Sequence, residues 1–257
     1  MAYTAIVSDW SGTGIKYPTD EQLMKKIAYY ALFEELKNVV LRGKLSHTAE
    51  IRRLLSARNT LKKAKREFER GEVSYKELVR AFNDFVIGGM HVSYVDNPVE
   101  SYCQESAGLV DHNLLQPVQK AHDRGKKTAF LSSSYDKSIK RILELAEYAD
   151  AFDVIVANSL VTDGDTIVGF TTNIYGKKAE VVQERFFRRN VLGEGLNERN
   201  TLYIGDSQDD EPVAEILAPG NFIVSLMAAD EYREHMARKY KAQTPENRED
   251  VERLLAD

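Results

Sequence analysis

The sequence predicts a doubly wound α/β fold with a mostly parallel sheet and a helical cap inserted after the first strand. Two patterns predict it. From about residue 112 onward, short apolar runs of strand length alternate with helical patterns, which is typical of a parallel sheet covered on both faces. Between residues 15 and 95, apolar residues recur almost wholly at helical spacing. We therefore expect an α/β core of residues 1–14 and 96–257 and a helical cap of residues 15–95.

The chain opens with a β-prone run, residues 3–9, that ends in a polar turn. The cap segment then carries three helical patterns. The first follows a Thr19–Gln22 capping box and stops at Gly43, the second covers about residues 48–70, and the third begins at a Ser74–Glu77 capping box and stops before Gly88.

The rest of the chain supplies the other strands of the core and their helices. We expect, in order, a helix at 112–124, a strand at 128–131, a helix at 136–147, a strand at 152–156, a hairpin at 160–172, a helix at 178–190, a strand at 201–204, a short helix at 211–217, a strand at 221–224 and two closing helices. Because parallel strands point the same way, their carboxyl ends lie at one edge of the sheet, where ligands bind in such folds.

Composition narrows the class of protein. The 257 residues are 43% hydrophobic and 29% charged, enough for a substantial core, and the formal net charge of −5 gives no general attraction to nucleic acid or to an anionic membrane. A single cysteine, Cys103, excludes an internal disulfide and a cysteine zinc cluster. We find neither a signal peptide pattern nor an apolar run of membrane-spanning length. We expect a cytoplasmic protein without nucleic-acid or membrane partners, and its oligomeric state stays open.

Polar side chains lie at four of the predicted element ends. They are Asp9 after the first strand, Ser132, Ser133 and Ser134 after the second, Lys177 and Lys178 at a helix start, and Asp206, Asp209 and Asp210 after the strand at 201–204. Carboxylate oxygens suit Mg²⁺, and free N–H groups at a helix start suit a phosphate dianion. Each signal alone is common in structural turns and caps, but together they indicate phosphoryl transfer.

Four short stretches resemble the motifs of the haloacid dehalogenase superfamily. They are Asp9-Trp10-Ser11-Gly12-Thr13, Leu131-Ser132-Ser133-Ser134-Tyr135, Lys178-Ala179-Glu180, and Gly205-Asp206-Ser207-Gln208-Asp209-Asp210. The stretch from Val156 to Gly169 further resembles the phosphoserine phosphatase branch. The resemblance implies a Rossmann-like core with a helical cap and a Mg²⁺-dependent phosphatase or phosphotransferase that acts on a small phosphorylated metabolite.

The resemblance also implies a role for each matching residue. Asp9 would attack phosphorus and form an aspartyl-phosphate. Mg²⁺ would be held by Asp9, the backbone carbonyl of Ser11, Asp206 and, directly or through waters, Asp210. Ser132 and the N–H of Ser133 would bind phosphate oxygens, and Lys178 would neutralise both Asp9 and the phosphate, with Lys177 as the alternative lysine.

Ser11 departs from the family pattern, which places a second aspartate there as general acid and base. A serine hydroxyl is a poor general acid or base near neutral pH. His47, His91 or a carboxylate of the cap are the candidates to replace it. Two other functions therefore stay open: a phospholigand-binding or regulatory protein with little turnover, and a hydrolase of non-phosphate substrates on the same scaffold.

Overall fold

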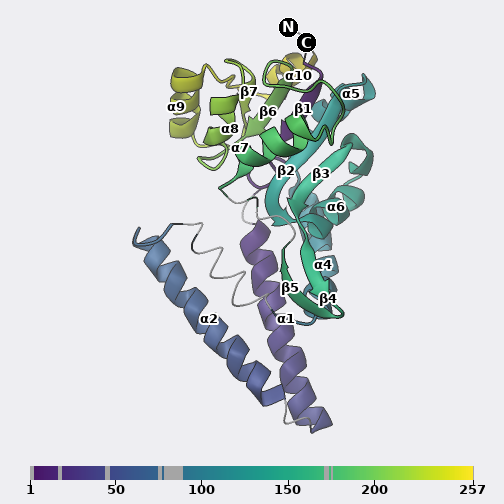
Figure 1. Ribbon diagram of the computed structural model, residues 1–257, viewed down its shortest axis with the longest axis vertical. Coiled ribbons are helices and arrows are strands. Elements are labelled where there is room, and N and C mark those ends of the chain that lie inside the picture. The colour runs from purple at the N-terminus through teal and green to yellow at the C-terminus, as the bar shows by residue number, and fades with distance from the viewer. Residues whose placement is uncertain are drawn as a thin grey trace. The chain divides into compact units, whose positions relative to one another are not determined.

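The computed structural model describes residues 3–16, 19–43, 47–74, 77, 89–170, 174 and 176–256 (Figure 1). Its helices are α1 (Thr19–Arg42), α2 (His47–Glu69), α4 (Ser93–Ser106), α5 (His112–Asp123), α6 (Asp136–Leu145), α7 (Lys178–Val181), α8 (Glu211–Ile216), α9 (Asp230–Tyr240) and α10 (Arg248–Ala256). Its strands are β1 (Ala5–Ser8), β2 (Lys127–Tyr135), β3 (Val154–Asn158), β4 (Leu160–Asp163), β5 (Thr166–Phe170), β6 (Thr201–Gly205) and β7 (Phe222–Val224).

The chain forms two compact units. The first comprises Met1–Thr19, Cys103–Ser159 and Thr172–Asp257, and the second comprises Asp20–Tyr102 and Leu160–Thr171. These bounds differ from the predicted domains mainly at the hairpin β4–β5, which belongs to the compact unit that holds α1 and α2. The division into a core and a cap remains a prediction.

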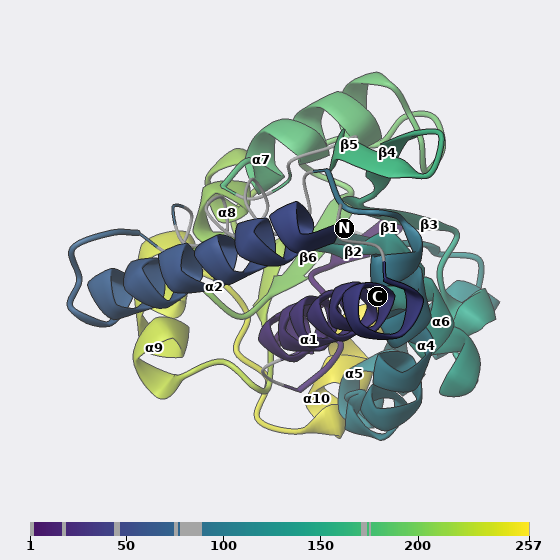
Figure 2. The ribbon, with the colours of Figure 1, turned by 90° about the horizontal axis from the view of Figure 1, so that it is seen from below.

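A five-stranded parallel sheet forms the centre of the first unit, in the order β3-β2-β1-β6-β7. The four residues of β1 are all buried, which is expected for a central strand covered on both faces. Helices α5 and α10 lie on one side of the sheet and α7 and α8 on the other (Figure 2). The predicted doubly wound α/β fold is confirmed.

Alternation along the strands builds the core on the α7–α8 side. Ala5 and Val7 of β1, Leu131 of β2 and Tyr203 of β6 join one buried cluster with Phe186, which follows α7. Side chains of a strand point alternately to its two faces, so Ile6 and Phe130 belong to the opposite layer. Both faces of the sheet are therefore packed against apolar side chains, and the polar loops lie at its carboxyl edge.

Two local predictions needed correction, and one helix was missed. The serines at 132–134 lie within β2, because the strand continues to Tyr135, which pairs with Asn158 after a register shift beyond Leu131. Helix α4 was not predicted, since polar residues and Pro98 interrupt its apolar pattern. The predicted helix at 178–190 is one α-helical turn, α7, continued by a π-helix over Val182–Arg188.

The second unit contains α1, α2 and the antiparallel hairpin β4–β5, which turns at Gly164 and Asp165 as predicted. The predicted capping box at residue 74 is present: the Ser74 N–H donates to Glu77 Oε2 at 2.7 Å, and the Glu77 N–H donates to Ser74 Oγ at 3.3 Å. The side chain of Thr19 and residues 78–88 of the third predicted helix lie outside what the structure describes. Among the described helices, none is long and apolar enough to cross a membrane.

Candidate active site

Asp9 lies directly after β1 and is fixed by the strand beside it. Its backbone N–H donates to the carbonyl of Ile204 at 2.8 Å, and only 4% of the residue is exposed. The chain then turns around the carbonyl of Trp10, which accepts the N–H of Gly14 at 2.8 Å. A Cβ on Gly14 would lie 2.9 Å from the rings of Trp10 and Phe130. Glycine is therefore required there, and the tight turn holds the Asp9 carboxylate at the carboxyl edge of the sheet.

The loop after β6 brings Asp206 and Asp210 to the same edge. Asp210 is fully buried, and its Oδ2 accepts the backbone N–H groups of Asp206 at 3.1 Å and Ser207 at 3.3 Å. A Cβ on Gly205 would lie 2.5 Å from the Asp210 carboxyl carbon, so only glycine permits this approach. Thr13 donates its hydroxyl to Asp206 Oδ1 at 3.0 Å, which links this loop to the turn after β1.

The other carboxylate oxygen of Asp210 is also shared by two donors. The Tyr203 hydroxyl and the Lys178 ammonium each donate to Oδ1 at 2.7 Å. Tyr203 stands on β6, completely buried, and Lys178 is the first residue of α7. Neither the Tyr203 hydroxyl nor Thr13 was among the predicted site residues. Because Tyr203 lies in a mostly apolar strand, its position predicts a core residue. Its place two residues before the Gly205-Asp206 turn was the signal that could have indicated a polar contact.

Lys178 connects the predicted nucleophile to the acidic loop. Its Nζ lies 3.0 Å from Asp9 Oδ1 and 3.5 Å from Asp209 Oδ2, and the residue is 4% exposed. Lys177 is exposed and lies next to it in the chain. Burial alone would lower the pKa of Lys178, but the carboxylates of Asp210 and Asp9 outweigh burial and raise this pKa well above its ordinary value. Lys178 is therefore a cation throughout the physiological range.

Carboxylates predominate around Lys178. Those of Asp9, Asp209 and Asp210 lie within 3.5 Å of its ammonium, and the carboxylate of Asp206 lies beside those of Asp9 and Asp210. Burial, followed by the charges of Asp210 and Asp206, raises the pKa of Asp9 well above its ordinary value despite the opposing effect of Lys178. Asp9, Asp206 and Asp210 each offer an oxygen within 4.8 Å of the others. A buried excess of carboxylates at this spacing fits a hard divalent cation.

The serine segment lies at the end of β2. Ser132 is 1% exposed, and its Oγ accepts the backbone N–H of Ser134 at 3.1 Å, which fixes the orientation of the hydroxyl. The carbonyl of Ser133 accepts the Asn158 amide at 2.6 Å, and Asn158 Oδ1 in turn accepts the N–H of Ile174 at 3.2 Å. Asn158 thus connects the end of β2 to the segment that precedes Lys178. The sequence analysis gave Asn158 no role.

The two histidines considered as replacements for the missing acid belong to the second unit. His47 Nδ1 lies 2.6 Å from Glu35 Oε2, and Glu35 is 3% exposed and also accepts the Tyr94 hydroxyl. His91 Nδ1 lies 2.7 Å from the hydroxyl of Ser93. Each histidine therefore has a polar partner within its own unit.

Comparison with solved structures shows which known proteins have a similar fold. The chain aligns over 90% of its length with a probable phosphoserine phosphatase from Vibrio cholerae (13% identity, TM-score 0.57) but spans only 58% of that chain. It covers 95% of a substrate-bound phosphoserine phosphatase over 96% of its own length (15% identity, TM-score 0.57). A protein of unknown function from Bordetella pertussis Tohama I gives a TM-score of 0.65 at 14% identity, with 95% of this chain and 98% of that chain covered. At such identities the likeness concerns the fold.

Sequence comparison gives the family. No curated protein matches this chain. The sequence profile of the haloacid dehalogenase-like hydrolases matches residues 53–215, which is more than half of the chain. The resemblance read from the four motifs is thereby confirmed, and the chain belongs to the haloacid dehalogenase-like hydrolase family.

Proposed function

We propose that this protein is a Mg²⁺-dependent phosphatase or phosphotransferase that acts on a small phosphorylated metabolite through an aspartyl-phosphate on Asp9. One observation carries the proposal: Asp9 Oδ1 lies 3.0 Å from the buried Lys178 ammonium, among carboxylates that outnumber it. A nucleophile beside a fixed cation is the arrangement that phosphoryl transfer requires. The family and the phosphatase-like fold support the same reaction class.

In this mechanism an Asp9 carboxylate oxygen forms a bond to phosphorus while the bond from phosphorus to the leaving oxygen breaks. Water then attacks the phosphorus of the aspartyl-phosphate and releases phosphate and Asp9. Lys178 faces the negative charge that gathers on the phosphoryl oxygens, and its raised pKa keeps it charged. The Ser132 hydroxyl and the Ser133 N–H would bind two of those oxygens.

The residues at the carboxyl edge of the sheet fit a divalent cation. Asp9, Asp206 and the backbone carbonyl of Ser11 would hold Mg²⁺ directly, and when bound the ion would neutralise the carboxylates and polarise the phosphoryl group. Both oxygens of Asp210 already accept donors within the protein. This favours an indirect role for Asp210, in which it orients Lys178 and the waters of the ion rather than ligating it.

Ser11 shapes the choice of substrate. Without a carboxyl group at this position, the leaving group receives no proton from the turn after β1. We infer that substrates with good leaving groups, such as aryl or acyl phosphates, react fastest. The cap, residues 15–95, would act as a lid that selects the substrate, and a cytoplasmic location agrees with the small phosphorylated metabolites proposed here.

Replacing the nucleophile tests the proposal. Asp9→Asn removes the attacking oxygen and little volume, so the protein should fold normally but lose at least about a thousandfold in kcat for p-nitrophenyl phosphate with Mg²⁺. Asp163→Asn, the same change at an exposed position of β4, is the control and should keep wild-type turnover. If Asp9→Asn retains a substantial fraction of the activity, the mechanism is wrong. If wild type has no turnover but binds beryllofluoride with Mg²⁺, the protein is a phospholigand-binding member of the family.

A further inference from the structure

Helix α2 differs in charge from the chain that contains it. Its sequence holds seven lysines and arginines against three glutamates, whereas the whole chain has a formal net charge of −5. The cations are not scattered evenly. Arg58, Lys62 and Arg66 of α2 and Arg70, directly after the helix, follow one another at intervals of four residues, and all four are exposed. We call these four residues the α2 stripe.

Helical geometry places the stripe on one side of α2. Residues four apart are separated by about 6 Å along the axis and turned by about 40°, so the stripe extends over about 18 Å. Like charges at this spacing repel each other and destabilise an isolated helix. A surface helix ordinarily relieves such repulsion by interleaving acidic residues at the same spacing. Residues 51–66, which include Arg58, Lys62 and Arg66, hold no acidic residue to relieve this repulsion, which favours a bound anion as the counterpart of the stripe.

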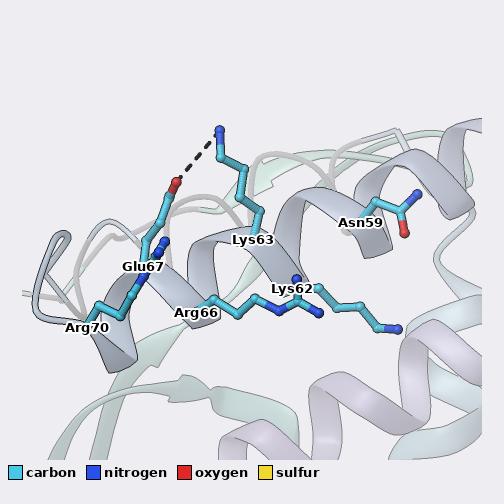
Figure 3. A pocket seen from close by; sticks show the side chains of 6 residues that line it. All are labelled: Asn59, Lys62, Lys63, Arg66, Glu67 and Arg70. Carbon is cyan, nitrogen blue, oxygen red and sulfur yellow. Dashed lines mark ion pairs between the residues drawn. The ribbon is translucent and has the colours of Figure 1, made fainter.

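Ion pairs near the stripe leave its centre open. Lys63 lies 3.7 Å from Glu67, and Arg70 lies 3.1 Å from Glu72. Within the described part of the chain, no carboxylate lies within ion-pair distance of Lys62 or Arg66. Figure 3 shows these two side chains extending along the same side of the helix, with Lys63 turned toward Glu67 on the other.

A hollow of about 720 Å³ lies against the same part of α2. It is lined by Asn59, Lys62, Lys63, Arg66, Glu67 and Arg70 (Figure 3). The volume is in the range of small-molecule sites, which span about 300–1,000 Å³. Such sites are mostly apolar, but the lining here is four cations, one amide and one carboxylate. An apolar ligand gains nothing from that lining, whereas a multiply charged anion meets several donors at once.

We propose that the α2 stripe binds a small molecule that carries two or more phosphate groups. The Arg66 guanidinium can hold one phosphate with two parallel hydrogen bonds, and Lys62, one turn away, can hold a second as a point charge. A single phosphate would engage only one of the two cations fully. The proposed site consists of residues of α2 and the residue that follows it, and it includes neither Asp9 nor the acidic loop.

Binding of inorganic tripolyphosphate tests the proposal. Titration calorimetry in EDTA at about 150 mM NaCl excludes Mg²⁺-dependent binding at the carboxyl edge of the sheet. We expect wild type to bind tripolyphosphate at least about tenfold more tightly than inorganic phosphate, and Lys62→Ala/Arg66→Ala to lose at least about tenfold in affinity. The variant Lys37→Ala/Lys120→Ala removes the same net charge from lysines that pair with Glu34 and Glu252, and it should stay within about threefold of wild type.

Three results would overturn the proposal. The first is that wild type does not bind tripolyphosphate, and the second is that the two double variants lose equal affinity for it. The third is that a single-stranded RNA oligonucleotide binds α2 more tightly than tripolyphosphate does, which would make the partner a nucleic acid. Circular dichroism checks that both variants are folded.

The same variants separate two sources of the ligand. If it is an effector, Lys62→Ala/Arg66→Ala abolishes the influence of tripolyphosphate on turnover of p-nitrophenyl phosphate; if it is the substrate, this variant raises KM for bisphosphorylated substrates alone.

Discussion

At the scale of single residues, Asp210 shows how the site is held rigid. Its Oδ2 accepts two backbone N–H groups of its own loop, and its Oδ1 accepts the Tyr203 hydroxyl and the Lys178 ammonium. Hydrogen bonds to a buried charged group are worth about 1.5–3 kcal/mol each. Because Tyr203 and Lys178 share one oxygen, the tyrosine limits the positions that the carboxylate, and therefore the lysine, can take. Tyr203 is thus a positioning residue for Lys178.

Tyr203→Phe removes only the hydroxyl. We expect the unfolding free energy to fall by about 1.5–3 kcal/mol, since a buried hydrogen bond to a carboxylate is lost. We also expect kcat to fall about tenfold with KM within about twofold, because Lys178 is misplaced in the transition state rather than removed. Steady-state kinetics and urea unfolding measure the two effects.

Tyr148→Phe is the control, since Tyr148 is also a buried residue of the first unit, but its hydroxyl lies 2.8 Å from Nδ1 of His112, away from the acidic loop. It should lose stability and keep kcat. Equal kcat losses in the two variants would show that Tyr203 acts on the fold alone.

At the scale of elements, Glu211 ties α8 to α9. Its Oε1 accepts His235, Lys239 and Tyr240, each at 2.9 Å. The hydrogen bonds from His235 and Lys239 lower the pKa of Glu211 from 4.5 to about 2. Because Glu211 follows Asp210 directly, the same contacts anchor the end of the acidic loop.

Glu211→Gln should destabilise the protein in a pH-dependent way. A carboxyl whose pKa is lower in the folded than in the unfolded state stabilises the fold above its unfolded pKa, and this contribution is lost as pH falls through the folded pKa. Solvent screens the partly exposed group, so we expect a loss of about 1 kcal/mol at pH 7 that shrinks between about pH 4.5 and 2. Urea unfolding of wild type and variant across this range measures it. A difference that does not change with pH would mean that the stabilisation comes from packing.

The same scale shows what the sequence could predict. The strands at 3–9 and 201–204 were predictable because each is an apolar run that ends in a polar turn containing glycine and aspartate. The structure places β1 and β6 there. The continuation of β2 through Ser134 was not, since the serines lack strand propensity and the pairing depends on a register shift against β3. Helix α4 was hidden by Pro98, and the Tyr203 contact by its place in an apolar strand. Both depend on tertiary neighbours, which local periodicity does not contain.

At the scale of the whole molecule, the candidate site is a gathering of charges from distant parts of the chain. Asp9, Lys178 and Asp210 come from the ends of β1, the start of α7 and the loop after β6. Their proximity was predictable from the parallel sheet, because every strand delivers its carboxyl end to one edge. The excess of carboxylates was visible as well, but their burial and its effect on the pKa of Asp9 required the packed structure.

This excess predicts that Mg²⁺ stabilises the protein and that the effect depends on pH. The pKa of Asp9 is raised, so without a cation the folded state gives up stability as pH rises through that pKa. Mg²⁺ must displace the proton, and its apparent affinity therefore rises with pH. At a concentration of about 100 Kd the ion adds about 2.7 kcal/mol, which for a chain of this size raises Tm by about 5–10 °C.

Thermal melts with Mg²⁺ or EDTA at pH 5.5 and 7.5 test this, and we expect the larger shift at pH 7.5. Asp206→Asn should reduce the shift, because it removes a proposed ligand, whereas Asp163→Asn, on the exposed strand β4, should leave it unchanged. If the wild-type melts with and without Mg²⁺ coincide at pH 7.5, the acidic cluster is not a cation site.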